Sequence, residues 1–286
     1  MASKIVIKEA PKDFPQYDQV DLSPECLPEP VFKEMKSPDK KDPETGKIEK
    51  AGITYYSAPL VHKTRGADGK LRVDKYFQIE GPVMRSNGGI AIRRKDDGKY
   101  EASIFVSHDI ENKEMAKFVG EPMDAADFAA MPEKNVVNEE GIVTEKGKES
   151  VGFMSQLHLR LLLFAFDKRD NIGIKGCRKL ANFEGKFGHP LKFNCNPDGS
   201  IMLGKNPTKY WKVFLMGNPE GKCRKANFSM PVPISEENPD GELVMDWCFL
   251  QEVELVFRPL YTFNSIYCGS DKLSIQCVIS SGVVIS

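Results

Sequence analysis

The sequence lacks long apolar runs. No stretch of about 18 apolar residues occurs among its 286 residues, and the first ten contain no apolar core of a secretory signal. The chain also has no P-loop, no G-x-G-x-x-G fingerprint, no H-E-x-x-H zinc motif and no G-x-S-x-G elbow. We therefore expect a soluble, non-enzymatic protein that spans no membrane and needs no cofactor.

Motifs for disulfide or metal chemistry are also missing. The seven cysteines are odd in number and widely separated, and none belongs to a C-x-x-C pair or a cysteine–histidine cluster with zinc spacing. The four histidines are scattered, with no pair at ligand spacing. We therefore expect reduced, mostly buried thiols, a reducing intracellular compartment and no metal.

Positive charge is concentrated in one region of a chain whose net charge is only −1. Residues 151–230 contain fourteen Lys and Arg against five Asp and Glu, a net charge of +9, whereas residues 1–150 carry −4 and the last 56 residues −6. Aromatic residues lie between the cations of the basic region. This composition is typical of a groove that attracts phosphates and stacks unpaired bases.

The chain has two consecutive parts that differ in composition and residue pattern. Residues 1–50 are rich in proline and charge, which predicts an extended or disordered arm. From residue 51 to 286 short strand-like segments alternate with turn residues, and Asp96-Asp97-Gly98 predicts a hairpin. Residues 109–150 are acidic and loop-like, which we interpret as a surface insertion. Residues 150–166 fit both strand and helix, and we favour helix because apolar residues share one helical face.

The expected fold class is mainly β, of the α+β kind. Many short strands at close spacing, bounded by Gly, Pro, Asn or Asp, favour a closed or nearly closed antiparallel sheet. The residues therefore predict a barrel or a sandwich that carries one or two helices.

The densest interleaving of cations and aromatics lies at residues 205–212, where three lysines surround a Tyr-Trp pair. If Trp211 points into the core, the period-two alternation of a strand places Tyr210 and Lys212 together on the opposite face. A base stacked on Tyr210 would then have its phosphate near Lys212. The alternative is that these aromatics are all core residues.

Three further clusters extend the candidate site. A glycine-bounded loop interleaves cations with aromatics that we expect to be exposed, a strand ends in two arginines, and a third set follows a Gly-Asn-Pro-Glu-Gly turn. The complete candidate nucleic-acid-binding set is Arg93, Arg94, Arg178, Lys179, Phe183, Lys186, Phe187, Lys205, Lys209, Tyr210, Lys212, Arg224 and Lys225.

The order of segments from Phe187 onward resembles a known family. Phe187-Gly-His-Pro is followed by an Asn-Pro-Asp-Gly turn, residues 204–212, Asp246-Trp247, Phe257-Arg-Pro-Leu, Ser265-Ile-Tyr-Cys-Gly-Ser, and Leu273-Ser-Ile-Gln through Val283-Val284. This order resembles the single-stranded DNA-binding proteins of nucleocytoplasmic large DNA viruses, which are distantly similar to the single-strand binder of the T-odd phages (podoviruses). The resemblance covers roughly the last 100 to 130 residues, and the first half only in texture.

The resemblance implies an OB-fold-like barrel over residues 51–286, with helical insertions and the N-terminal arm. It also implies sequence-tolerant binding of single-stranded DNA in viral replication, recombination or repair, at a replication site in the host cytoplasm or nucleus. RNA binding, a homodimer, contacts with viral replication proteins and packaging in the virion are left open. The phage proteins end in a flexible acidic tail that docks on polymerase, whereas residues 277–286 are strand-like, so tail-mediated docking is not expected.

A competing hypothesis is a viral structural protein. Its barrel would be a scaffold, and its basic region would contact acidic partners or a packaged genome. Solvent exposure of Phe183, Phe187 and Tyr210 distinguishes the two hypotheses, because core aromatics cannot stack on bases.

Overall fold

The computed structural model describes residues 14–36, 39–41, 45–49, 54–172, 174, 177–198, 201–202, 204–219, 223–235, 238–239, 241–269 and 271–285. The protein is 37% strand and 18% helix. The fold is therefore mainly β, as predicted.

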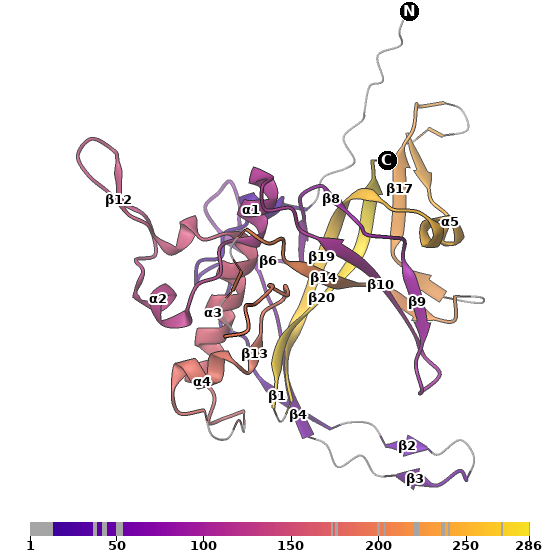
Figure 1. Cartoon of the computed structure of the whole chain (residues 1–286), viewed down its shortest axis with the longest axis horizontal. Coiled ribbons are helices and arrows are strands. Elements are labelled where there is room, and N and C mark those ends of the chain that lie inside the picture. The colour runs from indigo at the N-terminus through magenta and orange to yellow at the C-terminus, as the bar shows by residue number, and fades with distance from the viewer. Residues whose placement is uncertain are drawn as a thin grey trace, which may run out of the picture.

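A twelve-stranded sheet dominates the described residues (Figure 1). Its main path runs through β1 (Lys33–Lys36), β4 (Thr54–Pro59), β19 (Val256–Cys268), β20 (Leu273–Val284), β14 (Thr208–Val213), β10 (Tyr100–Ser107) and β9 (Ala91–Arg94). Off this path, β7 (Phe77–Glu80) and β8 (Met84–Arg85) pair with β19, β13 (Phe187–Gly188) and β17 (Asn227–Pro231) pair with β20, and β18 (Glu242–Val244) pairs with β17.

The direction of β20 corrects the predicted antiparallel sheet. β20 runs antiparallel to β19 but parallel to β13, β14 and β17, so the sheet is mixed. No closed barrel is found in the part of the chain that the structure describes. Strand composition and turn spacing do not reveal such parallel pairs, because their partners are joined by long crossovers rather than by hairpins.

Four small hairpins and several short helices complete the described structure. The hairpins are β2 (Lys40–Lys41) with β3 (Ile48–Glu49), β5 (Lys63–Arg65) with β6 (Leu71–Val73), β11 (Val136–Val137) with β12 (Val143–Glu145), and β15 (Leu215–Gly217) with β16 (Cys223–Lys225). The helices are η1 (Tyr17–Gln19), α1 (Lys113–Val119), α2 (Ala125–Ala130), η2 (Lys148–Ser150), α3 (Phe153–Asp167), α4 (Leu180–Glu184) and α5 (Trp247–Glu252). The predicted turn at residues 96–98 joins β9 to β10, with Gly98 at a φ of 78°.

Helices α1 to α4 lie on one side of the sheet, and they leave its other side, between β4 and the β9–β10 hairpin, uncovered (Figure 1). A layer of aromatic rings joins the helices to the covered face. The ring of Phe118 on α1 stacks on Tyr261 of β19 with centroids 5.6 Å apart, and Phe153 of α3 lies 6.0 Å from Phe263. Tyr261 also lies 4.6 Å from Trp211 of β14. Burial of these rings stabilises the packing of helices on sheet.

Residues 150–166, where the sequence fitted two structures, form mostly helix. Helix α3 buries Met154, Leu157 and Leu161, the apolar stripe that favoured this choice. It is buried nearly all round, because His158 and other polar residues also face packed elements. The central position of α3 among α1, α2 and α4 accounts for this burial.

The predicted surface insertion at 109–150 is only partly a surface feature. Helices α1 and α2 pack against α3 and bury Met115, Phe118 and Phe128. The β11–β12 hairpin is the part that projects from the domain (Figure 1). Of the acidic residues that suggested a loop, Glu114 and Asp127 are exposed on these two helices, and the others lie outside them, mostly in the connections.

Part of the predicted arm is folded onto the domain. Tyr17 is buried and its hydroxyl donates to the Glu114 carbonyl at 2.8 Å, while Leu22 and Leu27 lie in the core and β1 pairs with β4. Residues 1–13, 37–38, 42–44 and 50 of the arm lie outside the described residues. The sequence predicted an extended arm because its apolar residues have no regular spacing. The core residues that they contact are distant in sequence, so no local pattern reveals the docking.

In the described part of the chain, no helix is both long enough and apolar enough to cross a bilayer.

A glycine contact between α1 and α3 provides a test of this packing. A Cβ on Gly152 would lie 2.3 Å from the Cα of Gly120, which itself has a φ of 77°. We expect Gly152→Ala to lower the free energy of unfolding by about 1–3 kcal/mol, measured by urea denaturation, because backbone atoms cannot rotate away. Gly185→Ala is the control, since its nearest neighbouring atom is 4.0 Å away. Equal stabilities of the two variants would contradict this packing.

Candidate functional site

The candidate site lies on the side of the sheet that the helices leave uncovered. Along β14, Trp211 and Val213 are buried, whereas Lys212 is exposed and Tyr210 has 66% of its surface exposed. The predicted alternation is confirmed: Trp211 points to the helices, and Tyr210 and Lys212 point the other way.

Tyr210 is half of an aromatic pair. It lies opposite Phe105 of β10 in the strand register, and the two rings are 4.5 Å apart at 40°. Phe105 is half-buried because Ile104 and Val106 on either side take the core positions of β10. The pair offers a rigid, partly exposed ring surface next to Lys212, which lies opposite Ser103.

Positive charge surrounds this aromatic pair on the β9 side. Arg93 lies opposite Glu101, so both side chains share the face of Tyr210 by alternation. Lys95 Nζ lies 2.8 Å from Glu101 Oε2, and this hydrogen bond, with Lys212 and Arg93 as further cations, lowers the pKa of Glu101. Three cations therefore surround one ionised carboxylate, and the local charge is positive.

A second aromatic pair lies toward the opposite edge of the same face. The rings of Tyr55 on β4 and Tyr267 on β19 are 5.2 Å apart, and Tyr267 is 37% exposed. The register places Tyr267 opposite Ser57 of β4 and Ser274 of β20. Sequence reasoning missed this pair, although the alternation of buried Ile266 with Tyr267 is a signal of the same kind as Trp211 with Tyr210.

Polar side chains of β20, β19 and β7 form a strip beside the two aromatic pairs. Gln276 Nε2 donates to Ser274 Oγ at 2.8 Å on β20. On the neighbouring strands, Gln78 Nε2 donates to Thr262 Oγ1 at 2.9 Å, and the Thr262 hydroxyl donates to Ser280 at 3.0 Å. We call the surface formed by both aromatic pairs, this strip and Arg93, Lys95, Glu101 and Lys212 the open face.

Two basic residues of the predicted set belong to the sheet but not to the open face. Arg94 follows Arg93, so alternation directs it to the opposite side. Lys209 shares the side of Trp211, with Nζ 5.8 Å from that ring, and burial lowers the pKa of its ammonium. The prediction grouped Lys209 with Tyr210, and the alternation of β14 separates them.

The predicted aromatics of the glycine-bounded loop are core residues, so the expectation that they are exposed is wrong. Phe183 of α4 is buried against Phe166, with ring centroids 5.5 Å apart, and Phe187 is buried against His158 at 5.1 Å. They fill the space between α4, α3 and β20, a need that appears only once these elements meet.

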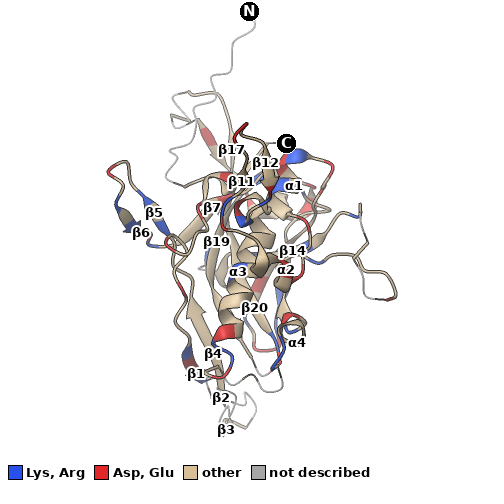
Figure 2. Cartoon of the chain, turned by 90° about the vertical axis from the view of Figure 1, so that its left-hand side faces the viewer, with Lys and Arg blue, Asp and Glu red and all other residues tan. Residues whose placement is uncertain are grey.

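The cations of the same loop lie on the helix-bearing side. Arg178 and Lys179 are exposed just before α4, and Lys186 is half-buried before β13. Basic and acidic segments are mixed on this side (Figure 2). These residues are not brought together with Tyr210.

The remaining predicted cations lie on other connections. Lys205 is exposed in the loop before β14. On the β15–β16 hairpin Arg224 lies opposite Met216, and Lys225 Nζ lies 5.4 Å from the Trp247 ring of α5. Of the thirteen predicted residues, Arg93, Tyr210 and Lys212 are the ones that lie on the open face.

The core behind Tyr210 is held by a buried histidine. Trp211 Nε1 donates to His108 Nε2 at 3.2 Å, and His108 Nδ1 donates to the Pro207 carbonyl at 3.0 Å. The bond from Trp211 needs the lone pair of Nε2 and therefore neutral His108, and burial lowers the pKa of His108 to about 4. The orientation of β14, and with it the position of Tyr210, therefore depends on an uncharged imidazole.

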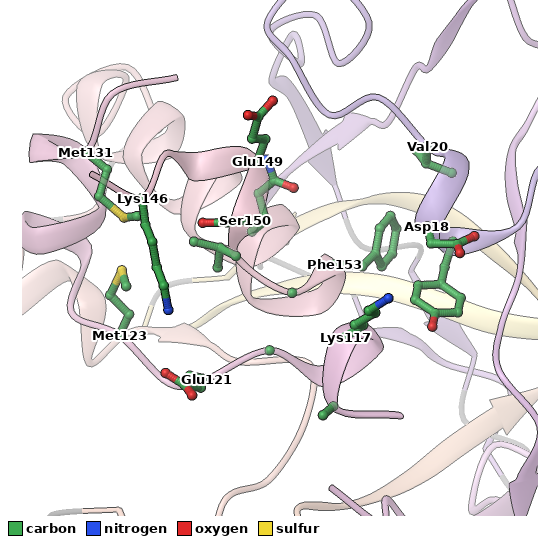
Figure 3. A pocket seen from close by; sticks show the side chains of 16 residues that line it. Asp18, Val20, Lys117, Glu121, Met123, Met131, Lys146, Glu149, Ser150 and Phe153 are labelled. Atoms are coloured by element: carbon green, nitrogen blue, oxygen red, sulfur yellow. The ribbon is translucent and has the colours of Figure 1, made fainter. Parts of the chain in front are cut away.

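A pocket of about 620 Å³ lies between α1, α3 and residues 17–20 (Figure 3). Lys146 extends between Met131 and Met123, and Lys117 lies beside Asp18 and Phe153 on the other side. Glu121 and Glu149 also line it, so charges of both signs are mixed. In the described residues, no three His, Cys, Asp or Glu side chains are grouped to hold a metal ion.

Comparison with known proteins adds no family to these observations. No protein-family model matches the chain, and the search of curated proteins finds no similar sequence.

The buried histidines predict a loss of stability in mild acid. Burial lowers the pKa of His108 and His189 to about 4 and that of His158 well below its usual value, whereas an unfolded histidine titrates near 6.5. The unfolded chain therefore binds more protons between these values. From about pH 7 to about pH 5, urea denaturation should show a loss on the order of 1–2 kcal/mol for each of His108 and His189, and a further loss from His158.

The carboxylates affect stability in a different pH range from the histidines, so the two contributions can be distinguished. Asp21 and Glu133 have lowered pKa values, so their stabilisation is lost only below about pH 4. A free energy of unfolding that stays constant down to about pH 5 would contradict the burial of neutral histidines.

Proposed function

We propose that the protein binds single-stranded nucleic acid along the open face. The observation that carries the proposal is the partly exposed Phe105–Tyr210 pair beside Lys212, on the side of the sheet that the helices leave uncovered. An exposed aromatic ring does not stabilise the core, and stacking with unpaired bases would give such a ring a function.

The chemistry of the open face suits unpaired strands. A base stacked on Tyr210 contributes about 1–3 kcal/mol whatever its identity, because every base has a flat π surface. Lys212 and then Arg93 follow Tyr210 toward the same end of the sheet, where they can contact the phosphates of the strand. The hydroxyls and amides of the polar strip accept or donate hydrogen bonds without demanding one sequence. The binding is therefore expected to be sequence-tolerant.

The second aromatic pair indicates the course of the strand. β14 and β19 are separated by β20, so Tyr210 and Tyr267 lie about 10 Å apart across the strands. A strand that crosses β14, β20 and β19 meets both pairs, with Ser274 and Gln276 of β20 between them. The proposed path thus runs from β9 toward β1.

The finer parts of the function stay proposals that rest on the resemblance described above. They are DNA as the natural ligand, an OB-fold-like relation of the sheet, and service to viral replication, recombination or repair in a reducing intracellular site. Binding without catalysis belongs to the same proposal. The mixed sheet and its uncovered face are compatible with strand-on-sheet recognition, which several folds share.

A double variant tests the proposed contact. Tyr210→Ala with Lys212→Ala should weaken binding to a labelled oligo-dT about tenfold or more, since it removes one stacking platform and one phosphate contact. Fluorescence anisotropy at two salt concentrations measures the affinity. Both side chains are exposed, so circular dichroism and the melting temperature should stay close to those of the wild type.

The control variant removes more charge from the other side of the molecule. Arg178→Ala with Lys179→Ala eliminates two cations near α4 and should change the affinity by less than about threefold. If the control weakens binding as much as the Tyr210 variant does, the basic helix side is the contact surface. If the wild-type protein does not bind oligo-dT, the structural hypothesis is favoured.

A third variant tests the path of the strand. Tyr267→Ala should weaken binding of a long oligo-dT by roughly fivefold, because one stacked base is lost. A very short oligo-dT, which cannot reach both aromatic pairs, should bind this variant and the wild type nearly equally. Equal losses for long and short oligonucleotides would contradict a path across both pairs.

A further inference from the structure

The histidines of this protein fall into two kinds. His62 has partners at both ring nitrogens, with Nδ1 2.9 Å from Asp74 and Nε2 3.0 Å from the Asp21 carbonyl. His108 is likewise satisfied by Pro207 and Trp211. In contrast, His158 Nδ1 and His189 Nε2 are buried and have no hydrogen-bond partner among the described residues. Buried polar atoms without partners are rare enough to need an explanation.

The two unpartnered histidines are neighbours. His158 comes from the middle of α3 and is only 5% exposed, and His189 follows β13. Their ring centroids are 4.6 Å apart, with 55° between the ring planes. Two independent elements thus bring two imidazoles, each with one unused nitrogen, to the same place.

Both imidazoles line a cavity of about 780 Å³ that also contains carboxylates. Its acidic lining residues are Asp124 and Asp127 of the α2 start and Glu184 at the end of α4. The Ala125 N–H donates to Glu184 Oε1 at 3.0 Å, which leaves Oε2 for another partner. Burial, with Asp124 and Asp127 nearby, raises the pKa of Glu184. The cavity therefore combines imidazole nitrogens with excess negative charge, and a cation would relieve it.

The state of the two imidazoles suits metal ligation. Burial lowers the pKa of both histidines, so both rings are neutral at physiological pH, as a metal ligand must be. His189 Nδ1 faces both the carbonyl of Leu191, at 3.1 Å, and its backbone N–H, at 3.0 Å, and the tautomer of the ring decides which of the two it bonds. In the tautomer that donates to the carbonyl, Nε2 keeps its lone pair free, which is the usual second-shell arrangement of a metal-bound histidine.

We propose that His158 and His189 bind a divalent transition-metal ion such as Zn²⁺ in this cavity, with Glu184 and water as the remaining ligands. Imidazole nitrogens favour Zn²⁺ and similar ions over Mg²⁺ and Ca²⁺, which prefer oxygen donors, and a carboxylate is a common additional ligand of Zn²⁺. No three donor side chains are already grouped among the described residues, so the site is a two-histidine site that recruits its third ligand on binding. The bound ion would tie α3 and α4 to β13, away from the open face.

Cobalt absorption tests the proposal on the full-length chain. Co²⁺ reports its ligands through visible d–d bands, and Zn²⁺ displaces it from a shared site. The chain should carry Cys195→Ser and Cys248→Ser, because these two cysteines are exposed and their thiolates compete for the metal. We expect saturable binding of one Co²⁺ per chain, reversed by Zn²⁺, and a higher melting temperature in excess Zn²⁺.

Variants distinguish this site from adventitious binding. His158→Gln with His189→Gln should abolish the d–d bands and the Zn²⁺-dependent rise in melting temperature. His62→Gln, a partnered histidine outside the cavity, should keep both. Glu184→Gln keeps both imidazoles and should weaken binding without abolishing it, which guards against misfolding of the double variant. No saturable Co²⁺ binding by the parent chain, or equal binding by the double variant, would overturn the proposal.

Discussion

The aromatic layer between the helices and one face of the sheet is the constraint on which the rest of this structure depends. Tyr261 is at its centre, in contact with Phe118 from α1, Trp211 from β14 and Phe263 on its own strand. These rings come from segments far apart in the chain, so their burial joins the basic region, the helices of residues 109–150 and the C-terminal hairpin into one core. Even Tyr17 of the N-terminal arm adds its ring, 5.3 Å from Phe118.

The helices cover only one face of the sheet, so the residues of the other face must be compatible with solvent. In the central strands most residues that alternate with the core are Ser, Thr, Gln, Tyr or Lys, with Val278 as an apolar exception, so the uncovered side is largely polar with two aromatic pairs. The pleat makes this division exact: a side chain belongs to one face or the other. That division separates Lys209 from Lys212 although they are three residues apart.

The helix-bearing side uses its residues for cohesion. Phe183 and Phe187 are buried where α4 and β13 meet α3, and the neighbouring histidines lie in the same packed region. The two sides of the molecule thus carry different chemistry, stacking and phosphate contacts on one and imidazole with carboxylate on the other. A substitution in the open face therefore makes little direct contact with the histidine cavity, and the reverse also holds.

The sequence by itself determined the mainly β class, the hairpin at Gly98, the helix near residue 160 and the opposite orientation of Trp211 and Tyr210. All of these depend on local turn chemistry or on alternation within one element, which neighbouring residues encode. Only the tertiary structure decided the parallel pairing of β20, the docking of the arm, the burial of Phe183 and Phe187 and the meeting of Tyr55 with Tyr267 or His158 with His189. These depend on which distant segments pack together, and a composition of cations and aromatics is the same whether its rings face solvent or core.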